Sequence, residues 1–236
     1  MDNLTIKYLT WDSDFFKKKI GQISVDKSDC IENILKIAKN EDYQLIYAFG
    51  KGDFFVDNEI LKQFNGHLAD RKVLYEKTIE TIKNEAPFVS VYKNNELIPD
   101  LEELAYISGE FSRFKLDKNF EENDFYRMYK VWIENSVKRL IADYVFIAAE
   151  NNSIKGMVTL KSDKEKGHIG LIAVSPDTQG KGYGKALIAA CENELLRKGI
   201  CILEVPTQTD NIQACKFYEK SGFHVKSITN IYHFWL

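Results

Sequence analysis

The stretch His168–Ile188, HIGLIAVSPDTQGKGYGKALI, joins an apolar run to three glycines that are separated from one another by single residues. The apolar run predicts a buried strand, and the residues after the glycines predict a helix with one apolar stripe: Leu187, Ile188, Cys191 and Leu195. Glycines at such a junction indicate a backbone that closely approaches something, or a conformation that side chains disfavour. The fold and the function therefore depend on what the loop Gln179–Gly184 holds.

Three kinds of ligand fit a glycine loop, and the sequence separates them. A nucleoside triphosphate loop needs Lys and then Ser or Thr after its last glycine, whereas Gly184 is followed by Lys185 and Ala186. A dinucleotide loop needs G-x-G-x-x-G with an acidic residue at the end of a strand, whereas Glu204 lies inside an apolar strand. A pyrophosphate on a helix N-terminus needs only a strand, a turn, glycines and a helix, in that order. The sequence predicts this third kind of site.

The segments around the loop predict an α+β fold. Strands are expected at 144–150, 151–163 and 167–176 as an antiparallel meander, then a strand at 201–207, a helix at about 210–221 and a strand at 224–236. A strong amphipathic helix is expected over 123–140, with this apolar stripe: Phe125, Met128, Tyr129, Trp132, Ile133, Val137 and Leu140. We expect a mostly antiparallel central sheet flanked by helices. The apolar end, 231–236, is expected to be an edge strand on which two copies could pair as a homodimer.

The first part of the chain predicts a smaller α/β unit. Strands are expected at 5–10, 43–50 and 73–81, and a helix at 28–40. The segment 83–100 is polar and contains two of the four prolines, so it reads as a join. We therefore expect an N-terminal α/β unit at 1–92 that contributes to acceptor binding, and a catalytic domain at 93–236.

Composition excludes several classes of function. The net charge is −3 with charges of both signs, so nothing indicates a nucleic-acid partner. No apolar run reaches the ~20 residues of a membrane span, and the N-terminus does not resemble a signal peptide. The cysteines, Cys30, Cys191, Cys201 and Cys215, form no CxxC pair, and no histidine stands at metal-ligand spacing. We expect a soluble cytoplasmic protein without a metal.

Two motifs together resemble one superfamily. The segment 174–187, VSPDTQGKGYGKAL, resembles the Q/R-x-x-G-x-G/A acyl-CoA motif of the GNAT acetyltransferases, through Gln179, Gly182 and Gly184. The segment 209–225 resembles their second motif, N-x-x-A-x-x-x-Y-x-x-x-G-F, through Asn211, Ala214, Tyr218, Gly222 and Phe223. By this order of motifs, with a strand between them, the chain is identified as a member of the superfamily over about residues 120–236. The resemblance implies the GNAT fold, with acetyl-CoA as co-substrate.

The resemblance also implies roles for individual residues. A β-bulge within 170–174 would splay the strand, so that its backbone can pair with the pantetheine arm. Tyr218 is the expected proton donor to the departing thiolate. The residues expected to bind the co-substrate are Ile172, Ala173, Val174, Gln179, Gly180, Lys181, Gly182, Tyr183, Gly184 and Asn211. Asn211 is expected to contact pantetheine or to cap its helix, and Lys185 is a further candidate for the phosphates.

The base and the acceptor stay open at this stage. His168, Glu134 or a water molecule could remove the proton from the amine. Short segments at 9–16, 112–114, 132–137, 169–174 and 207–211 resemble the dTDP-fucosamine acetyltransferases, which implies a dTDP-linked amino-dideoxy sugar as acceptor. Arg113 could then pair with a diphosphate, and Trp11 or Phe15 could stack on a base. The alternatives are another amine, such as a protein N-terminus, a lysine or a polyamine, or an acyl-CoA-binding module without turnover.

Overall fold

The computed structural model describes residues 5–26 and 28–236, and it divides the chain into two compact units. Unit 1 comprises Met1–Val73, Gln208–Asp210 and Ser227–Leu236, and unit 2 comprises Leu74–Thr207 and Asn211–Lys226. Strands β4 (Gly66–Thr78) and β10 (His224–Trp235) contribute to both units. These bounds differ from the expected division at residue 92, because the last strand of the chain pairs with an early one.

Unit 1 is a small α/β unit. Its strand order is β1 (Lys7–Tyr8), β2 (Ile20–Val25), β3 (Leu45–Lys51), β10 and β4. Strands β2 and β3 are parallel, so they need a crossover connection, which α2 (Ser28–Asn40) provides. The apolar side of α2 packs on the sheet through Ile31, Ile34, Leu35 and Ala38. Two short helices complete the unit, α1 (Thr10–Phe16) and α3 (Asn58–Gln63).

The C-terminal strand lies inside the sheet. It pairs antiparallel with β3, from Thr229 opposite Lys51 to Trp235 opposite Leu45, and its other neighbour is β4. Ile231, Tyr232, His233 and Phe234 are all buried. The expectation of an edge strand at 231–236 is therefore wrong. Pairing of two copies through this strand is no longer a reason to expect a homodimer. Alternation of hydrophobicity could not show this, because a strand buried on both faces is apolar throughout.

Unit 2 carries the predicted meander. Its strand order is β4, β9 (Ile202–Gln208), β8 (Gly167–Val174), β7 (Ser153–Ser162), β6 (Tyr144–Glu150) and β5 (Val89–Val91). Strands β5 to β8 are antiparallel neighbours, and β8 pairs with β9 in parallel. The remaining elements are α4 (Pro99–Ser108), α5 (Arg113–Leu116), α6 (Glu122–Val137), the 3₁₀ turn η1 (Pro176–Thr178), α7 (Tyr183–Arg197) and α8 (Ile212–Lys220). The predicted α+β class with a mostly antiparallel sheet flanked by helices is confirmed.

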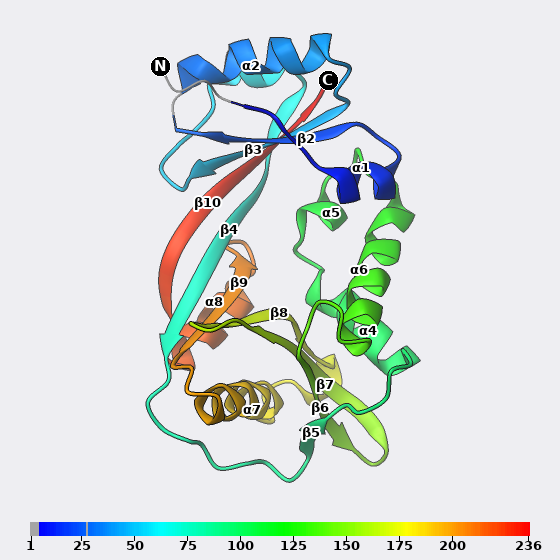
Figure 1. Cartoon of the computed structure of the whole chain (residues 1–236), viewed down its shortest axis with the longest axis vertical. Coiled ribbons are helices and arrows are strands. Elements are labelled where there is room, and N and C mark those ends of the chain that lie inside the picture. Colours follow the sequence, from blue (N-terminus) through cyan, green and yellow to red (C-terminus); the bar gives the residue numbers. More distant parts are fainter. Residues whose placement is uncertain (1–4, 27) are drawn as a thin grey trace. The chain divides into compact units, whose positions relative to one another are not determined.

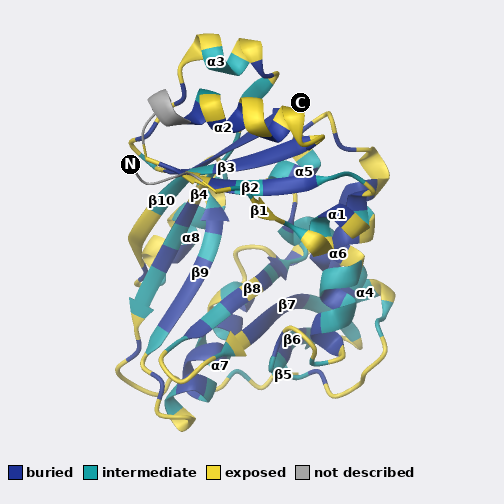
Figure 2. Cartoon of the chain, turned by 45° about the horizontal axis from the view of Figure 1, so that its top comes forward, coloured by how far each residue is buried: buried dark blue, intermediate teal, exposed yellow. Residues whose placement is uncertain are grey.

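Helices cover both faces of the meander in unit 2 (Figure 1). Helices α4 and α6 share a core with β6, β7 and β8, and the stripe of α6 is buried as predicted at Phe125, Met128, Tyr129, Ile133 and Val137. Leu140 does not belong to that stripe, because α6 ends at Val137 and Leu140 is 67% exposed. On the other face, α7 buries the predicted Leu187, Ile188, Cys191 and Leu195. Figure 2 shows how far β7 and β8 are buried between these layers.

Two expectations from composition can be compared with the structure. Cys191, Cys201 and Cys215 form no disulfide, and Cys191 is buried; the side chain of Cys30 lies outside the described residues. In the part of the chain that is described, no helix combines the length and the apolar character needed to cross a membrane.

A buried ion pair joins strand β4 to helix α7, and its lysine also contacts the end of α8. Lys77 of β4 pairs with Glu192 of α7, whose side chain is 2% exposed. The same ammonium group donates to the carbonyl of Ser221 at the end of α8, at 2.7 Å, and lies 5.6 Å from the ring of Phe223. One lysine thus ties strand, helix and helix end together.

Replacement of Lys77 tests this tie. Lys77→Met leaves the Glu192 carboxylate buried without its cation, so we expect the free energy of unfolding to fall by about 3–5 kcal/mol. Chemical denaturation measures it, and the double variant Lys77→Met/Glu192→Leu should recover most of the loss. Lys36→Met is the control, because the Lys36–Glu32 pair is exposed, at 55% and 39% for the two side chains. Equal losses for Lys77→Met and Lys36→Met would contradict the assignment.

Candidate functional site

The strand before the glycine loop contains a β-bulge. Val158 of β7 is opposite Ile172, but Leu160 is opposite Ile169, so Gly170 and Leu171 both face Thr159. The Thr159 hydroxyl accepts the amide of Leu171 at 2.8 Å, and a Cβ at Gly170 would lie 2.9 Å from that hydroxyl oxygen. The bulge predicted within 170–174 is therefore present, and Gly170 provides the room for it.

Strand β8 leaves β9 shortly after the two meet. Their parallel ladder consists of Gly167 opposite Leu203 and His168 opposite Glu204. From Ile169 to Val174 the described chain offers β8 no further partner on the β9 side. An extended polar chain can pair with such an edge as an added strand would. Ile172 and Val174 lie on this segment and are half-buried, and Ala173 between them is buried in the core under α4 and α6.

The loop after β8 is fixed by its own first residues. Asp177 accepts from Ser175 at 2.5 Å and from Lys155 at 3.0 Å, and Thr178 hydrogen-bonds to the Ser175 carbonyl through both its amide and its hydroxyl. Gly180 and Gly182 then adopt left-handed φ values of +79° and +89°. A Cβ at either glycine would meet nothing within 4 Å. These glycines are present for their backbone conformation, and the space beside them is open.

The amides at the start of α7 are available to a ligand. Gly182 is the N-cap of α7, and no side chain caps the helix. Among the described residues, no acceptor takes a hydrogen bond from the amides of Gly180, Gly182, Tyr183 or Gly184. Lys181 and Lys185 are exposed beside them. Open amides and the positive end of a helix dipole together favour a phosphate anion.

Gly184 has a different role from the other two glycines. Its φ is not left-handed, and a Cβ there would lie 3.0 Å from the ring of Phe217 in α8. Gly184 therefore allows α7 and α8 to approach each other. The Tyr183 side chain is buried against Phe88, with ring centroids 4.9 Å apart, and burial followed by the charge of Glu150 raises its pKa. Because the Tyr183 side chain is buried, its backbone amide is the group that is available to a ligand.

The second motif places α8 beside the loop. Asn211 is the N-cap of α8, and its side-chain oxygen accepts the amide of Ala214 at 3.1 Å. The capping role is thus observed, whereas a contact with pantetheine stays a prediction. Gln213 donates to Gln179 at 2.9 Å, which joins the glycine loop to the first turn of α8.

Tyr218 lies in an aromatic cluster of α8 and β4. Its side chain is 3% exposed, and its ring centroid is 5.6 Å from that of Tyr75, 5.4 Å from Phe217 and 5.7 Å from Phe223. Burial, followed by the nearby Cys215, raises the pKa of Tyr218. The phenol is therefore protonated at every physiological pH. Tyr75, which sequence reasoning did not single out, donates to Glu219 at 3.0 Å and supports one side of the cluster.

Both residues that could act as the base, His168 and Glu134, already interact with charged side chains. His168 has its Nδ1 3.2 Å from Glu204 and its Nε2 3.4 Å from Asp163, so both ring nitrogens face carboxylates. Burial would raise the pKa of Glu204, but hydrogen bonds from Lys226 and Lys166 outweigh it and lower the value to about 2. Glu134 is paired with Lys138 at 2.6 Å on the surface of α6. The roles of His168, Glu134 and water as the base therefore remain predictions.

The residues proposed for the acceptor lie in two short helices, α1 and α5. Trp11 and Phe15 of α1 stack on each other, with ring centroids 5.0 Å apart and planes at 13°. The Arg113 guanidinium of α5 lies 4.6 Å from the ring of Phe114. Their roles toward an acceptor remain predictions.

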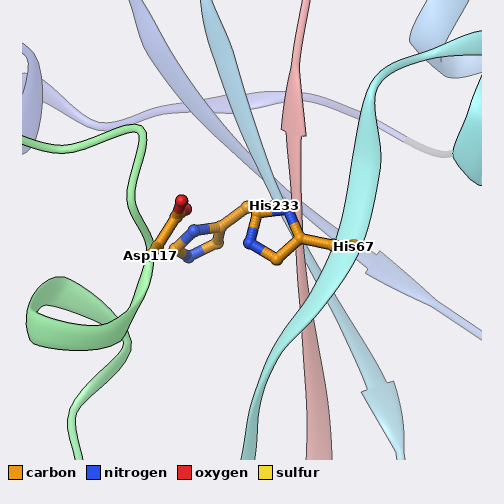
Figure 3. Close-up of side chains that lie close together, drawn as sticks. All are labelled: His67, Asp117 and His233. Carbon is orange, nitrogen blue, oxygen red and sulfur yellow. The ribbon is translucent and has the colours of Figure 1, made fainter.

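Unit 1 contains a pair of histidines that the sequence did not indicate. His67 of β4 and His233 of β10 pack edge to face, with ring centroids 5.8 Å apart (Figure 3). The ring centroid of Tyr47 lies 4.8 Å from that of His233. His233 is fully buried. Asp117, also drawn there, belongs to unit 2. The histidines are 166 positions apart in the chain, so only the pairing of β10 beside β4 brings them together.

Comparison with known proteins agrees with this geometry. The model of the acetyltransferase (GNAT) family matches residues 107–223, which include both motifs and the meander. A dTDP-fucosamine acetyltransferase of Escherichia coli O6:H1 (strain CFT073) is 33% identical over 132 residues, which is 55% of this chain and 56% of the relative. The match thus spans little more than half of that relative's length.

Solved structures share the fold. A conserved protein of unknown function from Staphylococcus epidermidis has a TM-score of 0.70 at 10% identity, over 100% of this chain and 92% of that one. A GCN5-related N-acetyltransferase from Sphaerobacter thermophilus has a TM-score of 0.54 at 16% identity, over 90% and 72%. With the bulged strand, the open glycine loop and the second motif in place, the chain belongs to the GNAT acetyltransferase family.

Proposed function

We propose that this protein is an N-acetyltransferase that moves the acetyl group of acetyl-CoA to the amine of a nucleotide-linked amino-dideoxy sugar. The observation that carries the proposal is the set of unengaged amides at Gly180, Gly182 and Tyr183, directly after a strand that has left its neighbour. The amides suit the pyrophosphate of coenzyme A, and the open edge of β8 suits its pantetheine arm. An ordinary core strand and an ordinary capped helix would offer neither.

The chain's own groups account for the chemistry. The amine nitrogen attacks the thioester carbonyl, the new N–C bond forms, and the C–S bond breaks to release a thiolate. A backbone amide of β8 beside the bulge can stabilise the developing oxyanion. Tyr218, kept protonated by its buried surroundings, can donate its proton to the thiolate, while the amine proton leaves through water. A thiolate held in the same buried surroundings would be a stronger proton acceptor than in water.

The acceptor class follows the name of one relative. That relative is a dTDP-fucosamine acetyltransferase, matched over 132 residues of this chain. A protein N-terminus, a lysine or a polyamine would keep the same co-substrate site and change only the acceptor. Because the spacing of the cysteines favours a reducing compartment, we propose a cytoplasmic location for the enzyme.

A branched side chain at Gly182 should block the phosphate site. Gly182→Val puts side-chain atoms into the open space beside the loop amides and strains a φ of +89°, so we expect affinity for coenzyme A to fall at least about tenfold by calorimetric titration. Gly199→Val is the matched control, because Gly199 also has a left-handed φ, of +74°, and open surroundings at the far end of α7. We expect Gly199→Val to lose a similar amount of folding stability and to keep its affinity for coenzyme A. An unchanged affinity of Gly182→Val for coenzyme A would contradict the proposal that this loop binds the phosphates.

Loss of the Tyr218 hydroxyl should slow turnover. Tyr218→Phe keeps the buried ring and removes the proton donor, so we expect kcat to fall by about 10²–10⁴-fold with little change in acetyl-CoA affinity. The factor should be the same from pH 6 to pH 9, because the raised pKa of Tyr218 keeps the phenol protonated throughout. Assays of free thiol release at each pH, with the parent and the variant, measure this ratio of kcat values. An unchanged kcat would dismiss the proton-donor role.

A panel of acceptors tests the proposed function as a whole. Purified protein with acetyl-CoA should release free thiol with dTDP-linked amino-dideoxy sugars, and not with spermidine or an unblocked peptide. Release with the peptide or the polyamine alone would replace the acceptor and keep the enzyme class. Tight coenzyme A binding without release from any amine would favour the binding-module alternative.

A further inference from the structure

An arginine of unit 1 is held in place without being neutralised. Arg71 lies on β4 and is half-buried, and its Nε donates to the side-chain oxygen of Asn230 on β10 at 3.1 Å. Across the described residues, the Arg71 guanidinium forms no ion pair with a carboxylate. A partly buried guanidinium usually faces an acidic group, because desolvation of its charge is costly. Here its anchor is a neutral amide.

That anchor is itself rigid. Asn230 is fully buried, and its Nδ2 donates to the carbonyls of Phe54 at 2.8 Å and Gly52 at 3.3 Å. The side chain thus uses its oxygen for Arg71 and both amide hydrogens for the loop after β3. The direction of the guanidinium is therefore set by the sheet and by this loop, before any ligand arrives.

The same loop presents an aromatic ring to solvent. Phe54 and Val56 point into the core, and the amide of Val56 donates to the buried Tyr232 hydroxyl at 3.3 Å. Phe55, between them, is 59% exposed, and its ring centroid is 6.0 Å from the Arg71 guanidinium. The carboxylate of Asp57, which ends this loop, caps α3 by accepting the Glu59 amide at 2.8 Å.

A fixed cation and a fixed aromatic face next to each other select a class of ligand. A guanidinium with unpaired N–H groups binds phosphate oxygens in pairs, and an exposed ring held on both sides stacks on a planar base. From this juxtaposition we infer that Arg71, Phe55 and Asn230 form a nucleoside-diphosphate site of unit 1. The diphosphate lies on Arg71 and the base on Phe55, while Asn230 positions the guanidinium. The inference rests on the proposed function for its ligand class, and it gives the acceptor's nucleotide a place.

Binding of dTDP to the full chain, measured by calorimetry without acetyl-CoA, tests the site. Arg71→Gln and Phe55→Ala should each raise the dissociation constant of dTDP about tenfold or more. Pyrophosphate should lose affinity only with Arg71→Gln, and thymidine only with Phe55→Ala. Lys36→Gln and Tyr8→Ala are the matched controls, because each removes an exposed cation or ring elsewhere in unit 1.

The outcomes separate this site from the proposed function. Unchanged coenzyme A affinity in both variants shows that they are folded, and Phe55→Ala alone decides if Arg71→Gln does not fold. Dissociation constants for dTDP within twofold of the parent, or no dTDP binding by the parent, overturn the site. Acetylation of an amino sugar with an unchanged KM in both variants also overturns the site and leaves the enzyme proposal standing. The variants could lose dTDP binding as predicted while the parent acetylates no amino sugar. That result would support the site and exclude an amino sugar as the acceptor.

Discussion

The bulge opposite Thr159 is the constraint on which the co-substrate site depends. By accepting the Leu171 amide, the Thr159 hydroxyl replaces a ladder hydrogen bond that the extra residue would otherwise leave unmade. The extra residue also exchanges the two faces of β8. Before it, Gly167 packs under Leu195 of α7, whereas after it Leu171 and Ala173 belong to the core under α4 and α6. A strand that changes faces cannot keep a regular ladder on both edges, and β8 parts from β9 at this point.

The glycine loop shows two physical reasons for one residue type. Gly180 and Gly182 are required by left-handed φ values and stand beside open space. Gly184 has a helical backbone and is required because Phe217 leaves no room for a Cβ. The first two shape the amides for a ligand, and the third holds α8, with Asn211 and Tyr218, against α7. A motif with a single spacing thus provides both the proposed anion site and a helix contact.

Sequence reasoning reached the features that local patterns encode. The stripe of α7, the strands of the meander and the Asn211 cap depend on neighbours a few residues apart, and each was found. The position of the bulge was instead implied by the family resemblance. It failed where partners are far apart in the chain. The interior place of β10, the His67–His233 contact and the Arg71–Asn230 bond all follow from pairing the last strand with early ones. Leu140 was wrongly included in the stripe of α6 for a local reason, since Arg139, at a φ of 61°, follows the end of the helix.

The handling of buried charge distinguishes structural from ligand-directed cations in this molecule. Lys77 faces Glu192, and Lys166 and Lys226 share Glu204, so each of these lysines ends on a buried carboxylate of its own unit. Arg71 is also held by a side chain of its own unit, but that side chain is the uncharged amide of Asn230. If Arg71 served only to join β4 to β10, a carboxylate at position 230 would bind it more strongly. The neutral Asn230 orients the guanidinium and leaves its charge to be satisfied by an anion from outside the chain.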